Sequence, residues 1–308
     1  MFDYQNMSEL LVPAKMYPVM SKIDGYRLRM EQNKEKMQLI YSDCQRLSLL
    51  TLNRMCPFSA TGIRTEEKEP EIYPGFAFAL KKTWDETEDR RFSVDFICRL
   101  HKALMGVKYP GGTVREEAAK ELENLCRGYE EARYDAQVPG LLLISALSYD
   151  FLSIRPFESG NEQLMEILLY MLLAQKGYSI GRYVIFDASF RVFEKMAAEL
   201  QENTFCDFSY ELLEWIKKLY ESLEERMEPA SSGSFSKMDR IDYVFNGTLI
   251  EMSKREIHSI LPDVSVTTLE LYLAELCKRG TLQKSGAGRL VAYSRLIGQV
   301  SKNGREKE

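Results

Sequence analysis

Only two histidines are present, His101 and His258, so any chemistry that needs an imidazole must use one of them. His101 lies in the segment 96–105, whose apolar residues recur at helical spacing, and His258 lies in the similarly apolar segment 257–261. Such positions are typical of packed or capping histidines. The sequence therefore excludes most of the hydrolases and zinc enzymes that depend on a histidine base, nucleophile or ligand cluster.

The cysteines do not form a metal-binding pattern either. No Cys-x-x-Cys pair occurs among the six of them, which are Cys44, Cys56, Cys98, Cys126, Cys206 and Cys277. Reduced and mostly buried thiols fit this scatter better than a disulfide framework or a zinc site, so we expect no bound metal. The formal net charge of -5 gives the whole chain no attraction to nucleic acid.

The composition is that of a globular protein, since 45% of the residues are hydrophobic and 28% are charged. The longest apolar runs, 140–147 and 167–174, are much shorter than the roughly 20 residues of a membrane-spanning helix, so we expect no membrane partner. Residues 1–9 carry two acids and no basic residue before an apolar stretch, unlike a secretory signal. The expected location is cytoplasmic.

Apolar residues recur with a period near 3.6 along almost the whole chain, which predicts a mainly α fold. The predicted helices cover 20–52 in one or two pieces, 92–105 with Ser93 as N-cap, 114–133, 138–154, 162–176, 188–202 and 208–225. Two strongly apolar helices, 138–154 and 162–176, flank the short loop 155–161, where Pro156 stops the first of them. The loop therefore joins two buried helices.

A second, smaller pattern follows the turn-forming stretch 228–236, which we interpret as a linker. The pattern predicts helices at 237–245, at 253–261 with a capping box of Ser253 and Glu256, and at 265–279, then strands at 280–284 and 290–294 joined by a hairpin turn. Three helices and a hairpin are the outline of a winged helix-turn-helix. The segments 264–269 and 273–282 also resemble the turn, recognition helix and wing entry of that family.

The loop between the two apolar helices carries the most specific motif. Residues 154–165 read Ile-Arg-Pro-Phe-Glu-Ser-Gly-Asn-Glu-Gln-Leu-Met and resemble the signature I-H-P-F-x-[DE]-G-N-G-R-x-x-R of Fic (Fido) proteins. The pair Leu100-His101 and the segments 149–151 and 169–178 resemble their counterparts in that family. The likeness covers about residues 20–225, and a winged helix is a common C-terminal companion in the family.

The resemblance implies a Fic-type helical core and, in active members, transfer of AMP from ATP, with Mg²⁺, to a protein hydroxyl group. Arg155 stands at the position of the catalytic histidine, and a guanidinium cannot act as a general base. Ser159 replaces the metal-binding carboxylate, so Glu158 would have to supply that group. Two elements of the chemistry, the base and the metal ligand, are therefore altered.

The helix after the loop departs from the signature as well. Glu162 replaces a glycine, and Gln163 and Glu166 replace two phosphate-binding arginines. The retained residues Gly160 and Asn161 are expected to supply left-handed backbone values that shape the turn. The candidate residues for a nucleotide or phosphate loop are Arg155, Pro156, Phe157, Glu158, Ser159, Gly160, Asn161 and Gln163.

Three interpretations of the loop stay open. The favoured one is a catalytically degenerate adenylyltransferase homologue that acts as a binding or regulatory scaffold without a cofactor. The second is residual nucleotide binding, with Arg155 as an anion clamp. The third is a rearranged AMP transferase that uses ATP and Mg²⁺.

Two further departures favour the scaffold. The inhibitory motif [ST]-x-x-x-E-[GN] of many Fic proteins has a degenerate counterpart at 57–62, where Thr61 replaces the glutamate before Gly62. The family's β-hairpin flap also has no clear counterpart, because the turn 111–115 leads directly into a predicted helix. A protein without activity needs neither part.

The C-terminal pattern leaves its partner open. Basic residues barely outnumber acids in 237–296, which is a weak electrostatic footprint for DNA. The candidates for DNA contact are Thr267, Thr268, Lys284 and Arg289. The alternative is contact with an unidentified protein or with a second copy in a homo-oligomer.

The whole sequence thus predicts a mainly α protein, with a Fic-type helical core followed by a small α+β winged-helix domain. The predicted divisions are an N-terminal helical region 1–90, the Fic-like core 91–227, the linker 228–236, the winged helix 237–297 and a disordered tail 298–308.

Overall fold

The computed structural model describes most of the chain. The described ranges are 2–9, 12–55, 73–85, 91–186, 192–200, 204–231, 236–246, 248 and 250–296. They are mainly helical, with a small antiparallel sheet near the C-terminus, as the hydrophobic pattern predicts. Within them, no helix has the length and apolar character to cross a membrane. Thr61 and Gly62 of the degenerate inhibitory motif, and the expected tail 298–308, lie outside the described residues.

The chain divides into two compact units. Unit 1 comprises Met1–Gln32 and Thr51–Tyr220, and unit 2 comprises Asn33–Leu50 and Glu221–Glu308. Helices α2 (Gln38–Met55) and α9 (Phe205–Ser231) contribute residues to both. Residues 33–50 therefore belong with the C-terminal unit although they lie far from it in the sequence.

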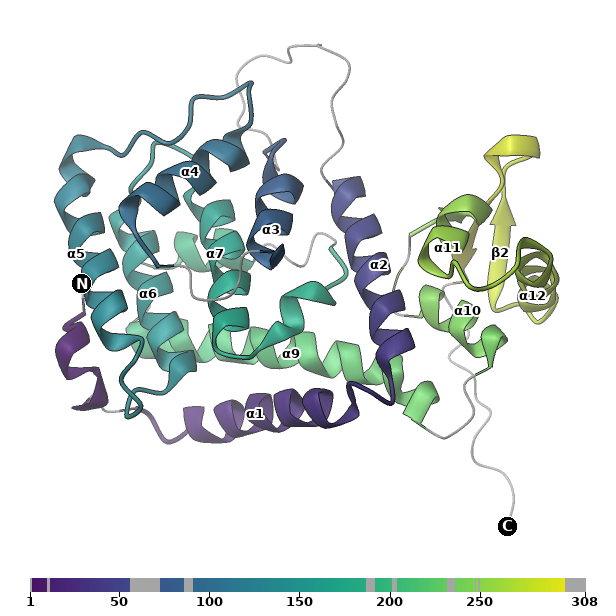
Figure 1. The fold of residues 1–308 in the computed structure, drawn as a ribbon, viewed down its shortest axis with the longest axis horizontal. Helices are drawn as coiled ribbons and strands as arrows, with labels where there is room; N and C mark the ends of the chain where they lie inside the picture. The colour runs from purple at the N-terminus through teal and green to yellow at the C-terminus, as the bar shows by residue number, and fades with distance from the viewer. Residues whose placement is uncertain are drawn as a thin grey trace. The chain divides into compact units, whose positions relative to one another are not determined.

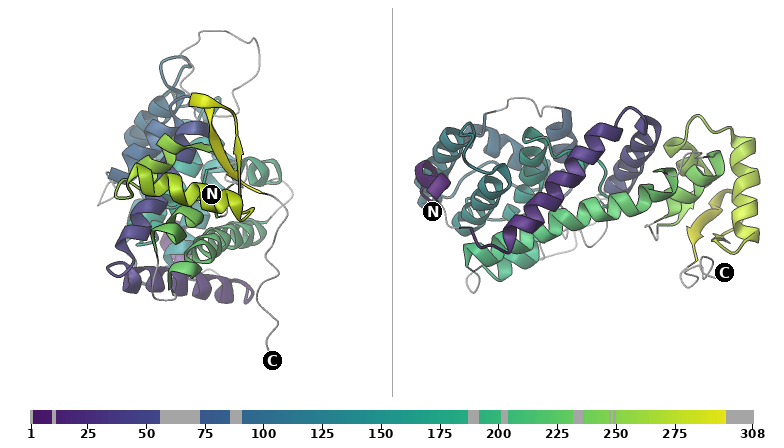
Figure 2. Two further views of the ribbon diagram at one scale, coloured as in Figure 1. Left: turned by 90° about the vertical axis from the view of Figure 1, so that its right-hand side faces the viewer. Right: turned by 90° about the horizontal axis from the view of Figure 1, so that it is seen from below.

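Unit 1 is a bundle of helices around α7, to which α3, α4, α6 and α8 all pack (Figure 1). The remaining bounds in this unit are η1 Tyr4–Glu9, α1 Met16–Asn33, α3 Phe76–Asp85, α4 Val94–Met105, α5 Glu116–Ala132, α6 Gly140–Ile154, α7 Asn161–Gln175, η2 Ser179–Arg182 and α8 Val192–Ala198. Figure 2 shows α1 running beside α9, where Tyr26 and Tyr220 stack with ring centroids 5.8 Å apart.

The two central helices, α6 and α7, bury nearly all of their side chains. Buried serines on α6 satisfy their hydroxyl groups locally, because Ser145 and Ser148 donate to carbonyl oxygens four residues earlier at 2.9 and 2.8 Å. Ser93 caps α4 as predicted and accepts a hydrogen bond from the backbone N–H three residues later. The loop that joins α6 to α7 thus lies between two buried helices.

Unit 2 contains three helices and a sheet: α10 Lys237–Phe245, α11 Lys254–Ile260, α12 Val266–Lys278, β1 Met252–Ser253, β2 Leu282–Ser285 and β3 Ala292–Arg295. The antiparallel strand order is β1-β3-β2, and Tyr293 on β3 pairs with Met252 on one side and Lys284 on the other. The predicted capping box at the start of α11 is present. Strand β1 was not predicted, because two residues carry no alternating pattern.

Helix α9 ends at Ser231, inside the stretch 228–236 whose composition indicates a linker. Leu223 and Met227 on this helix are buried, and their packing extends the helix beyond the point where local propensity would end it. The described chain resumes at Ser236, which forms a second capping box with Asp239 at the start of α10.

A buried arginine organises unit 2. Arg240 on α10 is 4% exposed and donates to Asp43 on α2 at 2.8 and 3.1 Å and to Asp263 at 2.6 and 2.8 Å. Burial raises the pKa of Asp43, which the bonds to Arg240 partly offset, whereas the bond to Arg240 lowers the pKa of Asp263 to about 2. Cys44 and Tyr243 share a hydrogen bond nearby. This network holds the first part of α2 within unit 2.

Candidate functional site

The loop between α6 and α7 turns at two left-handed residues. Arg155 caps α6 with φ 46° and ψ 65°, and its N–H donates to Phe151 O at 3.0 Å. Gly160 has φ 74° and precedes α7. The expectation that Gly160 and Asn161 are both left-handed is wrong for Asn161, which is the first residue of α7. The second left-handed residue is Arg155, at the end of α6, where the following Pro156 prevents the right-handed helix from continuing.

Asn161 fixes the shape of the loop. Its Oδ1 accepts a hydrogen bond from Phe157 N at 3.0 Å, and its Nδ2 donates to Phe157 O at 2.8 Å. Both side chains are buried. One amide thus satisfies both backbone groups of Phe157, which water cannot reach, and the loop closes on the start of α7.

His101 on α4 also contacts the loop. Its Nδ1 accepts a hydrogen bond from Gly112 N at 2.9 Å, so its Nε2 carries the proton and donates to Ser159 O at 3.0 Å. Its ring stacks on Phe157 at 3.8 Å between centroids. Burial lowers the pKa of His101, although the bond to Ser159 opposes the shift. His101 is thus a packed, neutral, positioning residue, as its helical context predicts.

Arg115, just before α5, forms hydrogen bonds with the end of α6. Its backbone N–H donates to Pro156 O at 2.9 Å, its Nε to Arg155 O at 2.9 Å and its Nη2 to Ile154 O at 3.0 Å. These bonds satisfy carbonyl groups that the helix end leaves without intrahelical partners. Sequence reasoning missed Arg115, because the turn before it gives no sign that it faces a segment 40 residues away.

Gln163, a predicted loop residue, points into unit 1. It is buried, and its Oε1 accepts a hydrogen bond from Tyr73 N at 2.9 Å, next to the start of α3. The ring of Tyr73 in turn lies close to Gly160. Gln163 therefore links α7 to the segment that precedes α3.

The exposed guanidinium of Arg155 is paired. Arg155 Nη1 lies 2.5 Å from Glu162 Oε1 on the first turn of α7, and the two side chains are 48% and 20% exposed. Glu158 is exposed and Ser159 is half-buried. Within the described residues, no group of three His, Cys, Asp or Glu side chains is placed to hold a metal ion. Among the described residues, Arg155 thus forms its ion pair with a carboxylate of α7.

The predicted DNA-contact residues are spread over unit 2. Thr267 is exposed and Thr268 shares a hydrogen bond with Ser265 at the start of α12. Lys284 on β2 lies near Cys277 at the other end of α12, where burial raises the pKa of the thiol and the charge of Lys284 opposes that shift. The side chain of Arg289 lies outside the described part. The structure thus places the threonines and Lys284 near opposite ends of one helix.

Comparisons with known proteins support the fold. No protein-family model matches the chain, and no curated protein matches it in sequence. Solved structures do match, among them the crystal structure of a Fic family protein from Desulfovibrio desulfuricans G20, with a TM-score of 0.50 and 14% identity over 95% of this chain and 99% of that chain. The protein therefore has a Fic-like fold, mainly helical with a small C-terminal antiparallel sheet.

Proposed function

We propose that this protein is a degenerate member of the Fic family that acts as a binding or regulatory scaffold. The observation that carries the proposal is the pair between Arg155 and Glu162 at 2.5 Å. In the signature of active members, that first position holds the catalytic histidine. Here it holds a cation that is already neutralised by its own chain.

The chemistry of AMP transfer argues in the same direction. The attack of a protein hydroxyl requires a base, and the guanidinium of Arg155 offers no lone pair at physiological pH. Loss of a positioned base typically costs a factor of roughly 10² to 10⁴ in rate. His101, the imidazole that contacts the loop, has both ring nitrogens engaged by Gly112 and Ser159 and cannot replace it.

The start of α7 is also unfavourable for phosphate. A helix N-terminus attracts anions, but Glu162 places a carboxylate in the first turn of α7 and Glu166 adds a buried acid one turn later. Gln163, where the signature has an arginine, is turned towards Tyr73. A bound triphosphate would have to break the pair of Arg155 with Glu162 and accept two nearby acids.

The unit 2 surface favours a protein partner over DNA. Leu271 lies on α12, the helix that would enter a DNA groove, and is 67% exposed. Glu270 and Glu275 flank it and form ion pairs with Lys254 and Arg279. Because each acid offsets a neighbouring cation, that face offers little net positive charge to DNA phosphates, whereas an exposed leucine with a polar rim occurs at protein contacts. We therefore assign this unit, as a second candidate, to a winged helix that binds protein.

Calorimetric titration with ATP, with and without Mg²⁺, tests the scaffold function. We expect no saturable heat at millimolar nucleotide, which corresponds to binding weaker than about 4 kcal/mol. Restoring the signature with Arg155→His and Ser159→Asp should give little AMP transfer, because Glu162, Gln163 and Glu166 remain. Saturable binding that Arg155→Ala abolishes, or AMP transfer by the unaltered protein, would overturn the proposal.

A further inference from the structure

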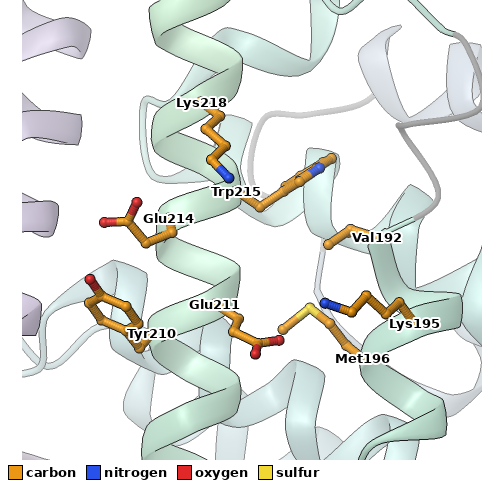
Figure 3. A pocket seen from close by; sticks show the side chains of 8 residues that line it. All are labelled: Val192, Lys195, Met196, Tyr210, Glu211, Glu214, Trp215 and Lys218. Carbon is orange, nitrogen blue, oxygen red and sulfur yellow. The ribbon is translucent and has the colours of Figure 1, made fainter.

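A hollow of about 450 Å³ lies between α8 and α9 in unit 1 (Figure 3). The apolar part of its lining is Trp215 on α9 together with Val192 and Met196 on α8. Figure 3 shows the indole of Trp215 extending from α9 towards α8. The volume falls within the range of roughly 300–1,000 Å³ that is usual for small-molecule sites, so the hollow has room for a small ligand.

Four charged side chains also line the hollow, and three of them have an opposite charge beside them. Glu214 accepts a hydrogen bond from Lys217 at 2.6 Å and points away from α8. Lys195 on α8 forms an ion pair at 4.0 Å with Glu199, four residues later. In Figure 3 the ammonium group of Lys195 is directed towards Glu211 on α9. This end of the hollow thus sets two acids against one ammonium group and does not attract an anion.

Tyr210 completes the lining and lies beside one more cation. Its ring points away from α8 in Figure 3 and lies 4.6 Å from the ammonium group of Lys15. Lys15 in turn forms an ion pair with Asp207 at 3.7 Å. These groups therefore have partners outside the hollow.

The fourth charged residue of the lining, Lys218, is available to a ligand. Within the described residues, no hydrogen bond or ion pair engages its ammonium group or the indole N–H of Trp215. Lys218 follows Glu211 by seven residues on α9, which is two turns and about 10 Å along the axis. Figure 3 accordingly places both nitrogen atoms at the end of the hollow remote from Glu211. Two unengaged donors at one end of an apolar hollow favour a ligand with a single anionic acceptor group.

We propose that this hollow binds a small aromatic monocarboxylate, in which a short aliphatic chain joins the ring to the carboxylate. The carboxylate accepts a charge-assisted hydrogen bond from Lys218, and the indole N–H of Trp215 is a second donor at the same end. The ring packs against Trp215 and the sulfur of Met196, and aromatic groups favour both contacts. A second carboxylate at the far end of the ligand would meet Glu211 and is disfavoured. The inference is independent of the loop and of the scaffold function.

Intrinsic fluorescence offers a direct readout. Trp215 lines the hollow, whereas Trp84, the other tryptophan, is buried and gives a constant background. The full-length protein is titrated with 3-phenylpropionate, which does not absorb where tryptophan is excited. We expect a saturable change in emission with a dissociation constant on the order of 0.1–1 mM. Binding should be roughly tenfold weaker for the neutral 3-phenylpropan-1-ol, for propionate, which lacks the ring, and for the dicarboxylate 3-(4-carboxyphenyl)propionate.

A matched pair of lysine variants locates the carboxylate. Lys218→Gln should weaken 3-phenylpropionate roughly tenfold, because it removes the free ammonium group. Lys195→Gln removes an ammonium group of the opposite wall that already pairs with Glu199, and should change the affinity by less than about twofold. A loss in Lys195→Gln as large as that in Lys218→Gln would overturn the proposal.

Charge reversal adds a gain of binding that damage to the fold cannot imitate. Lys218→Glu should prefer 3-phenylpropylamine, whose ammonium group takes the place of the carboxylate, over 3-phenylpropionate. The emission change should also disappear in Trp215→Phe, because Trp84 does not contact the ligand. No saturable change with 3-phenylpropionate at a concentration on the order of 10 mM, or an unaltered preference in Lys218→Glu, would show that the hollow is not such a site.

Discussion

The guanidinium of Arg155 lies 2.5 Å from the carboxylate of Glu162, across the turn that joins α6 to α7. Asn161 and His101 hold the backbone of the same turn through hydrogen bonds to Phe157 and Ser159. The turn therefore combines a backbone fixed by buried hydrogen bonds with a guanidinium that is already ion-paired.

Glu162→Gln should release Arg155. The neutral amide removes the charge that holds the guanidinium, and one free cation then stands beside the amino end of α7, where anions are favoured. We expect weak, salt-sensitive heat with inorganic phosphate in this variant and none in the parent protein. The double variant Arg155→Ala/Glu162→Gln should lose it again. Equal heats in the single and double variants would show that Arg155 plays no part.

Asn161→Ala should destabilise unit 1 by about 2–4 kcal/mol, because it leaves the buried N–H and C=O of Phe157 without partners. Urea unfolding followed by circular dichroism measures the loss. Ser153→Ala is the control, since this exposed hydroxyl bonds only to its own helix, and it should change stability by less than about 0.5 kcal/mol. A similar loss of stability in the two variants would contradict the role of Asn161 in holding the backbone of Phe157.

Gly160→Ala and Gly280→Ala separate backbone strain from crowding. Both glycines have left-handed backbones, with φ of 74° and 72°, so each substitution costs about 1–2 kcal/mol in strain. A Cβ at Gly160 would also lie 3.2 Å from Tyr73 and 3.3 Å from Met105, whereas one at Gly280 meets nothing within 4 Å. We expect Gly160→Ala to be the more destabilising in urea unfolding. Equal losses would mean that the surroundings of Gly160 yield freely.

The sequence predicts the helices around the loop better than the contacts that shape it. The apolar periodicity predicts α6 and α7 correctly, because the burial of these helices determines both their sequence pattern and their structure. Arg115 and Gln163 are examples of contacts that the sequence does not predict. Arg115 donates to the end of a helix 40 residues away, and Gln163 bonds to Tyr73, which is 90 residues away. Such pairings depend on tertiary approach and leave no local signal. The resemblance to the signature locates the loop, but only the structure shows that Glu162 forms an ion pair with Arg155.

The neutral state of His101 should make stability depend on pH. Its folded pKa lies below the ordinary 6.5, so the unfolded chain binds more protons between the two values and the free energy of unfolding rises with pH there. This contribution is complete above about pH 6.5 and is lost as pH falls through the lower folded pKa. Unfolding midpoints of the parent and of His101→Phe at several pH values isolate it, because contributions from other groups cancel. A constant difference between the two proteins would contradict the assignment.

Arg240→Leu should be strongly destabilising, because it leaves the carboxylate of Asp43, which is fully buried, without its main partner. We expect a loss of about 3–5 kcal/mol in urea unfolding at neutral pH. The double variant Arg240→Leu/Asp43→Leu removes the buried charge together with its partner and should recover much of that loss. The pKa of Asp263, about 2 in the parent, should also return towards 3.8 when Arg240 is absent, which carboxyl NMR titration measures. A double variant as unstable as the single one would show that Arg240 acts through packing of its side-chain stem and not through charge.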